Sequence, residues 1–174
     1  MNKKCVFLDR DGVINHDYGY VGSKSRFIFI DGVIEALQTI TKLGYDLIIV
    51  TNQSGIGRGY FTKNDFEHLM KHMCRIFSEN GIKIKSIYYC PHSPSLSSDG
   101  VSSACRCRKP SPTLILQALE KYNYDPAQCY LIGDKTSDIE AGHQAEISNL
   151  VLLTGKNENL NLNYSYSKFK SLLD

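Results

Sequence analysis

The sequence lacks a large excess of charge of either sign. Its 20 Lys and Arg residues and 18 Asp and Glu residues leave a formal net charge of +2 over 174 residues. A chain this close to neutrality carries no strong field for nucleic acid or for an anionic membrane surface. We therefore expect neither a nucleic-acid partner nor a membrane partner.

Long hydrophobic runs are also missing. No stretch approaches the roughly 18 consecutive apolar residues of a transmembrane helix, so we expect no membrane span. The first apolar run ends at Asp9 after four residues, which is too short for a signal-peptide core. These absences predict a cytoplasmic protein. In a reducing cytosol its six cysteines are expected to bind metal or to be buried rather than to form disulfides.

The hydrophobic residues that are present, 42% of the chain, form short apolar runs that alternate with segments of helical periodicity. We expect buried strands at 5–9, 46–51, 87–90, 129–133 and 149–153, and helices at 33–43, 63–79, 114–122 and 138–143. Strands separated by helices predict an α/β fold in which a parallel sheet is covered on both faces, a three-layer Rossmann-like arrangement.

The chain shows no internal repeats, and its length fits one domain of ordinary size. We expect that domain to occupy residues 1–156. The remaining residues, 157–174, form an Asn- and Ser-rich tail, in which we expect a short helix over 168–173.

Three of the expected strands end in an acidic or hydroxyl residue, namely Asp9, Thr51 and Asp134. In an open parallel sheet, ligands bind beyond the carboxyl ends of the strands, so these side chains should meet there with Asp11. Carboxylates gathered with a hydroxyl group suit a hard divalent cation, most naturally Mg²⁺. A single such aspartate more often caps a helix or turn, but three strands ending this way weaken that interpretation.

Phosphoryl transfer would give each of these groups a task. A carboxylate beside Mg²⁺ can attack phosphorus in line and form an aspartyl phosphate. A second carboxyl group can protonate the departing oxygen and later activate water. A threonine hydroxyl and a lysine would neutralise the equatorial oxygens, where charge accumulates.

These motifs resemble those of the haloacid dehalogenase (HAD) phosphatases in order and spacing. The segments that carry the resemblance are Asp9-Arg-Asp-Gly-Val-Ile14, Thr51-Asn52, Lys109 and Gly133-Asp-Lys-Thr-Ser-Asp138. The resemblance implies a HAD-like fold. It leaves the role of Asp138 open between a structural contact and a metal contact.

Catalytic roles follow from the same resemblance. It implies Asp9 as the nucleophile and Asp11 as the general acid and base. It implies that Thr51 and Lys109 steady the phosphoryl group. Mg²⁺ would be held by Asp9, by the backbone carbonyl of Asp11 and by Asp134.

A second constellation combines three thiols with one imidazole: Cys90, His92, Cys105 and Cys107. This is a closed ligand set for structural Zn²⁺, although the one-residue spacers are tighter than common zinc-finger spacing. The four residues lie along a long irregular stretch, 91–112, that otherwise has no cross-link to hold it. Free thiols with a surface histidine are the alternative. We expect zinc to fold this stretch and to position the Arg108 and Lys109 that follow it.

The sequence also narrows the substrate class. About twenty residues separate Asp11 from the first expected long helix, too few for a cap domain, so short loops must select the substrate. Two groups of HAD phosphatases share the Cys-Pro-His and Cys-x-Cys-Arg-Lys-Pro pattern, namely heptose bisphosphate phosphatases and histidinol-phosphate phosphatases. The chain resembles the heptose group nearly letter for letter over 16–21, 29–34, 50–59, 88–92 and 133–135.

That resemblance implies removal of the 7-phosphate from a heptose 1,7-bisphosphate, a small-molecule substrate, on the route to nucleotide-activated heptose for bacterial surface glycans. It implies substrate contacts from Asp17, Tyr18, Gly19, Tyr20, Asn52, Gln53, Ser54, Arg108 and Lys135. The alternatives are a histidinol-phosphate phosphatase, a polynucleotide phosphatase and a non-catalytic zinc-stapled binding module. We expect a monomer, and no motif selects between the α and β anomers.

Overall fold

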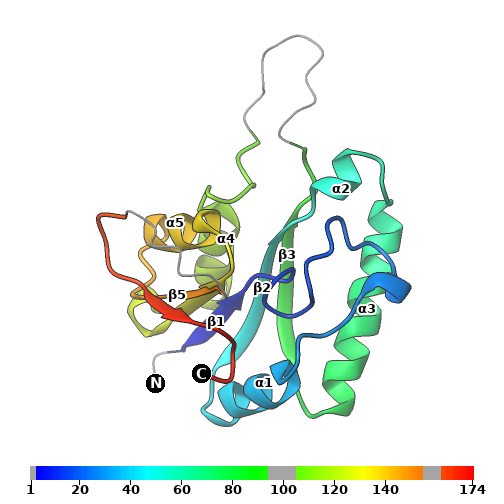
Figure 1. Ribbon diagram of the computed structural model, residues 1–174. Helices are drawn as coiled ribbons and strands as arrows, with labels where there is room; N and C mark the ends of the chain where they lie inside the picture. The colour runs from blue at the N-terminus through cyan, green and yellow to red at the C-terminus, as the bar shows by residue number, and fades with distance from the viewer. Residues whose placement is uncertain (1–2, 94–104, 155–161) are drawn as a thin grey trace.

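One parallel sheet organises the protein in the computed structural model, which describes residues 3–93, 105–154 and 162–174 (Figure 1). The strand order is β3-β2-β1-β4-β5-β6, and every neighbouring pair is parallel. The strands are β1 (Cys5–Leu8), β2 (Asp46–Asn52), β3 (Ile84–Cys90), β4 (Tyr130–Gly133), β5 (Asn149–Leu153) and β6 (Ser167–Phe169). The direction of chain progression reverses between β1 and β4, which is where such sheets bind ligands.

Helices cover both faces of this sheet, so the predicted three-layer α/β fold is confirmed (Figure 1). They are α1 (Val33–Lys42), α2 (Ser54–Gly57), α3 (Lys63–Glu79), α4 (Thr113–Tyr122) and α5 (Thr136–Gln144), with 3₁₀ turns at Lys24–Arg26 and Pro126–Gln128. The α1–α3 side is filled by one apolar core and the α4–α5 side by another. Within the described ranges, no helix is long and apolar enough to cross a membrane.

Alternation along the strands divides the apolar residues between the two cores. In β1, Cys5 and Phe7 face the α4–α5 core, whereas Val6 and Leu8 face the α1–α3 core. All four side chains are at most 3% exposed. A central strand that is buried on both faces must be apolar throughout, which explains the uninterrupted run before Asp9.

The C-terminal segment is the part of the fold where the sequence prediction was wrong. The expected helix over 168–173 is absent from the described residues 162–174, and Ser167–Phe169 instead forms β6. This strand pairs with β5, with Lys168 opposite Leu152. Pairing with the open edge of β5 satisfies backbone groups that a short, weakly apolar helix could not satisfy as well.

Candidate active site

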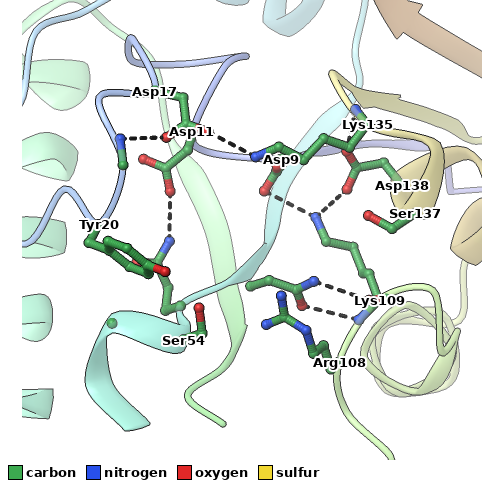
Figure 2. Close-up of a pocket in the computed structure, with 14 residues that line it drawn as sticks. Asp9, Asp11, Asp17, Tyr20, Ser54, Arg108, Lys109, Lys135, Ser137 and Asp138 are labelled. Carbon is green, nitrogen blue, oxygen red and sulfur yellow. Dashed lines mark hydrogen bonds and ion pairs between the residues drawn. The ribbon is translucent and has the colours of Figure 1, made fainter. Parts of the chain in front are cut away.

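A pocket of about 410 Å³ lies beyond the carboxyl ends of β1, β2 and β4 (Figure 2). Most of the predicted site residues line it, namely Asp9, Asp11, Asp17, Gly19, Tyr20, Asn52, Gln53, Ser54, Arg108, Lys109 and Lys135. Gly55, Ser137 and Asp138 complete the lining. Of the residues predicted for catalysis, substrate and Mg²⁺, three are not part of the lining, namely Tyr18, Thr51 and Asp134. The topology therefore brings segments from five places in the chain to one pocket.

Lys109 lies at the buried end of this pocket and is 4% exposed. Its Nζ is 3.0 Å from Asp9 Oδ1 and 2.6 Å from Asp138 Oδ1, and it donates to the Val50 carbonyl at 2.6 Å. Burial by itself would lower the pKa of Lys109, but the charges of Asp138 and Asp9 raise it above its ordinary value. Lys109 is therefore a fixed positive charge beside Asp9.

Two side chains hold this charge in place. The Asn52 amide pairs with the Lys109 backbone, because Asn52 Oδ1 accepts from Lys109 N and Asn52 Nδ2 donates to Lys109 O, both at 3.1 Å. Asp138 accepts from Lys109 on one oxygen, and its other oxygen accepts from the backbone N–H of Lys135 at 3.0 Å at the start of α5. Asp138 thus anchors both Lys109 and the first turn of α5.

The carboxylates beside Lys109 fit a hard divalent cation. One ligand oxygen from each of Asp9, Asp134 and Asp138 lies within 4.8 Å of the others. Asp134 Oδ1 is buried without a hydrogen-bond partner. Burial and the charge of Asp9 raise the pKa of Asp134 to about 7, and a cation bound by these oxygens would offset that penalty. Oxygen-only ligands of this kind suit Mg²⁺.

Asp11 is held by three donors. Arg10 Nη2 (2.7 Å) and Asn15 Nδ2 (2.9 Å) both donate to Asp11 Oδ1, and Gln53 Nε2 (2.9 Å) donates to Asp11 Oδ2. Arg10 is fully buried and also donates to the Val21 carbonyl at 2.7 Å. Sequence reasoning missed Arg10 and Asn15. The sequence did carry a signal for Arg10, because this charged residue lies directly between Asp9 and Asp11.

Gln53 also donates to Thr51 Oγ1 at 2.9 Å. Because this oxygen accepts a hydrogen bond, the hydroxyl proton of Thr51 is left to donate to an anion. Thr51 and Gln53 are buried. The side-chain amides of Asn52 and Gln53 thus contact the protein groups Lys109, Thr51 and Asp11, so both residues organise the pocket.

The rim of the pocket is more exposed. Lys135 Nζ donates to Asp17 Oδ2 at 2.9 Å, and Asp17 Oδ1 accepts from the Gly19 backbone at 3.0 Å. Burial alone would raise the pKa of Asp17, but the hydrogen bonds from Lys135 and Gly19 hold it below its usual value. Arg108, half-buried, points its guanidinium into the pocket (Figure 2). The rim thus carries two different cationic groups, the ammonium group of Lys135 and the guanidinium group of Arg108.

The four predicted zinc ligands also meet in the structure. His92 Nδ1 is 2.9 Å from Cys105 Sγ, which is 3.3 Å from Cys90 Sγ and 3.1 Å from Cys107 Sγ. Burial opposes ionisation of Cys105, yet hydrogen bonds from its neighbours lower its pKa to about 6. Burial and the neighbouring thiols raise the pKa of Cys90 and of Cys107, so Cys105 is the first of the three to ionise. Three sulfurs and one imidazole gathered at these distances suit Zn²⁺. The predicted loop between His92 and Cys105 lies largely outside the described residues.

Comparison with known proteins gives three consistent findings. Residues 106–170 match a family model described as HAD-hydrolase-like. The chain is 47% identical over 155 residues to the D-glycero-beta-D-manno-heptose-1,7-bisphosphate 7-phosphatase of Pasteurella multocida, covering 88% of this chain and 84% of that one. The enzyme of the same name from Haemophilus influenzae is 46% identical over 154 residues, covering 88% and 83%.

A solved structure is similar over nearly the whole fold. It is the D,D-heptose 1,7-bisphosphate phosphatase of B. bronchiseptica, complexed with magnesium and phosphate. The TM-score is 0.85 at 28% identity, and the match covers 98% of this chain and 93% of that one.

Proposed function

Because the chain belongs to the D-glycero-beta-D-manno-heptose-1,7-bisphosphate 7-phosphatase family of HAD-like hydrolases, we propose that it removes the 7-phosphate of that heptose bisphosphate. It is a phosphoric monoester hydrolase of heptose metabolism. The observation that carries the reaction is the meeting of Asp9, Asp11 and Lys109 in one pocket. The names of the relatives support the substrate and the β anomer, and they do not favour histidinol phosphate.

Asp9 and Asp11 divide the chemistry in this proposal. A carboxylate oxygen of Asp9 attacks phosphorus in line and the bond from phosphorus to the sugar oxygen breaks, while Asp11 gives its proton to that oxygen. Asp11 then takes a proton from water, whose oxygen attacks the aspartyl phosphate. The products are the heptose 1-phosphate, inorganic phosphate and the free carboxylate of Asp9.

The charge that builds up on the transferring group needs compensation. Lys109 and the hydroxyl of Thr51 donate to its equatorial oxygens. Asp9, Asp134 and the backbone carbonyl of Asp11 would hold Mg²⁺. When bound, this ion neutralises phosphoryl charge. The Mg²⁺ and phosphate named for the B. bronchiseptica relative support this assignment.

The rest of the substrate would contact the rim. We propose that residues 17–20, Ser54 and Lys135 contact the sugar. Asn52 and Gln53, which line the pocket wall, would contact it as well. Arg108 would bind the second phosphate, because a guanidinium offers a planar set of donors that matches phosphate oxygens.

We also propose that Cys90, His92, Cys105 and Cys107 bind one Zn²⁺, which ties the end of β3 to the segment carrying Lys109. Zinc would be measured by elemental analysis of purified protein, together with thermal unfolding. Cys107→Ser should lose the metal and lower Tm, whereas Cys74→Ser, on α3 outside the cluster, should keep it. A protein that folds and works with less than about one tenth of an equivalent of metal would contradict the zinc proposal.

The function is tested by phosphate release with Mg²⁺ from three substrates: the β-heptose bisphosphate, the α-heptose bisphosphate and histidinol phosphate. We expect the highest kcat/KM for the β-heptose bisphosphate. Asp9→Asn should abolish turnover while the fold survives. Asp31→Asn, the same change at an exposed acid outside the pocket, should not. Preference for histidinol phosphate, or wild-type turnover by Asp9→Asn, would overturn the proposal.

We infer a monomeric enzyme that works in the cytoplasm. None of the six cysteines, all of which lie within the described residues, forms a disulfide, which suits a reducing compartment. Light scattering of the purified protein tests the monomer, and fractionation of the source cells tests the compartment.

A further inference from the structure

The loop of residues 17–20, which we call the rim loop, has an unusual backbone. Gly19 and Tyr20 both lie in the left-handed region, with φ of 70° and 50°. A bulky residue such as tyrosine rarely adopts this conformation, because its Cβ crowds the backbone. Such strain persists where surrounding contacts hold it, and it often marks a functional segment.

Apolar burial does not supply those contacts. Tyr18 is 54% exposed and Tyr20 is 45% exposed. The ring of Tyr20 meets the edge of Tyr60, at a centroid distance of 4.7 Å, but Tyr60 is itself 62% exposed. The rim loop therefore depends on polar contacts for its shape.

Arg26 provides most of these contacts. From the end of the 3₁₀ turn Lys24–Arg26, its Nη2 donates to the carbonyls of Tyr18 at 2.8 Å and Gly19 at 3.0 Å. Its Nη1 reaches the carbonyl of Tyr20 at 3.5 Å. One guanidinium thus holds three consecutive carbonyl groups. Lysine could not do so in the same way, because its ammonium group is a single compact centre without the planar fork.

Arg26 holds the loop without lining the pocket, and it lines a neighbouring surface pocket together with Tyr20 and Tyr60. Asp17, Gly19 and Tyr20 line the pocket, and Arg26 does not. In Figure 2, Tyr20 lies on the side of the pocket opposite Lys109. Movement of the rim loop would therefore change the wall that faces the sugar while leaving the buried reacting groups in place.

We propose that Arg26 is a positioning residue that sets selectivity for the bisphosphate by fixing the rim loop. This inference rests on the proposed function. The inference predicts different behaviour for substrates that contact the rim loop and for substrates that do not. A heptose bisphosphate contacts the rim loop, whereas a small aryl phosphate such as p-nitrophenyl phosphate needs only the groups around Asp9.

The test compares Arg26→Ala, Arg26→Lys and Lys24→Ala. Lys24→Ala is the matched control, because it removes the same charge from the same exposed turn. Arg26→Ala should lower kcat/KM for the heptose bisphosphate about tenfold, mainly through KM. Its kcat/KM for p-nitrophenyl phosphate and its Tm should match the wild type, and Lys24→Ala should resemble the wild type with both substrates.

Arg26→Lys separates the geometry of the contact from its charge. Arg26→Lys should recover only a small part of the lost kcat/KM for the heptose bisphosphate, because lysine restores the positive charge but not the planar guanidinium. Full recovery by Arg26→Lys, an equal loss with both substrates, or no loss in Arg26→Ala would each overturn the inference. Wild-type protein that does not prefer the heptose bisphosphate would overturn the proposed function and, with it, this inference.

Discussion

At the scale of single residues, Gly12 shows how closely the backbone of the first motif approaches the proposed metal ligands. Its φ is +84°, and a Cβ built there would overlap the carboxylate of Asp134. Gly12→Ala should therefore displace Asp134. We expect a rise of about tenfold or more in the Mg²⁺ concentration needed for half-maximal phosphate release. The measurement is a Mg²⁺ titration of the initial rate.

Gly81→Ala is the control for Gly12→Ala. Gly81 has a similar φ of +74° but no atom within 4 Å of the built Cβ. It shares the backbone strain, about 1 to 2 kcal/mol, without the collision. If both variants required the same Mg²⁺ concentration as the wild type, the close approach of Gly12 to Asp134 would have no part in metal binding.

Lys109 should matter for stability as well as for rate. Lys109→Met leaves Asp9 and Asp138 buried without their cationic partner, and breaking a buried ion pair from one side typically costs about 3 to 5 kcal/mol. We expect a loss of this order in the free energy of unfolding, measured by urea denaturation, and no detectable turnover. Adding Asp138→Asn should restore part of the stability and none of the turnover. No change in stability would contradict this account of the ion pair.

The sequence predicted that Asp9, Asp11 and Lys109 gather at one place, because motif order is visible in one dimension. It left Asp138 open between a structural contact and a metal contact. In the structure one oxygen of Asp138 meets Lys109 and the other caps α5, and Asp138 also lies within the carboxylate group that could hold a cation. Arg10 and Asn15 were missed because a donor to Asp11 can come from any nearby segment. Only the folded loop shows which side chains reach that carboxylate.

At the scale of elements, the sequence predicted five strands and four helices that the structure contains, with bounds that differ from the structure by up to three residues. It also predicted a helix over 168–173, which the described residues 162–174 do not form, and it missed the short helix α2. Strong apolar periodicity made this possible. The sixth strand was missed because Ser167–Phe169 is short and mostly polar. A weak signal does precede it. Leu162, Tyr164 and Tyr166 alternate with polar residues, as extended chain does, and all three pack against the α4–α5 core.

The link between α4 and β2 gives a prediction that depends on pH. The hydroxyl of Tyr124, just after α4, donates to Asp46 Oδ2 at 2.6 Å, at the start of β2. Burial and the neighbouring Asp46 raise the pKa of Tyr124 in the folded state. Tyrosine in the unfolded chain ionises near pH 10. Tyr124 therefore stabilises the fold fully below about pH 10 and progressively less above it, because only the unfolded state loses the proton.

Tyr124→Phe should lower the free energy of unfolding by about 1 kcal/mol near neutral pH, since it removes one hydrogen bond to a half-exposed carboxylate. The difference from the wild type should shrink above about pH 10. Urea unfolding at several pH values measures both effects. Tyr18→Phe, at a tyrosine that is 54% exposed, serves as the control. A difference that stayed constant with pH would contradict the assigned pKa direction.

At the scale of the whole molecule, the C-terminal segment connects the two faces of the sheet. Its alternating residues Leu162, Tyr164 and Tyr166 pack on the α4–α5 core, and Leu172 packs on the α1–α3 core. Leu173 then lies against Gly32 at the start of α1. Between these contacts, β6 pairs with the edge of β5. This segment is therefore part of the layered fold and protects a strand edge.

Deletion of residues 162–174 should destabilise the protein and expose β5. We expect Tm to fall by at least about 3 °C, because loss of several half-buried apolar contacts is worth more than about 1 kcal/mol. An uncovered edge strand pairs readily with other chains, so light scattering should show concentration-dependent association. Deletion of 170–174 alone keeps β6 and should lower Tm without association. If the longer deletion stayed monomeric, protection of the β5 edge would not be the role of β6.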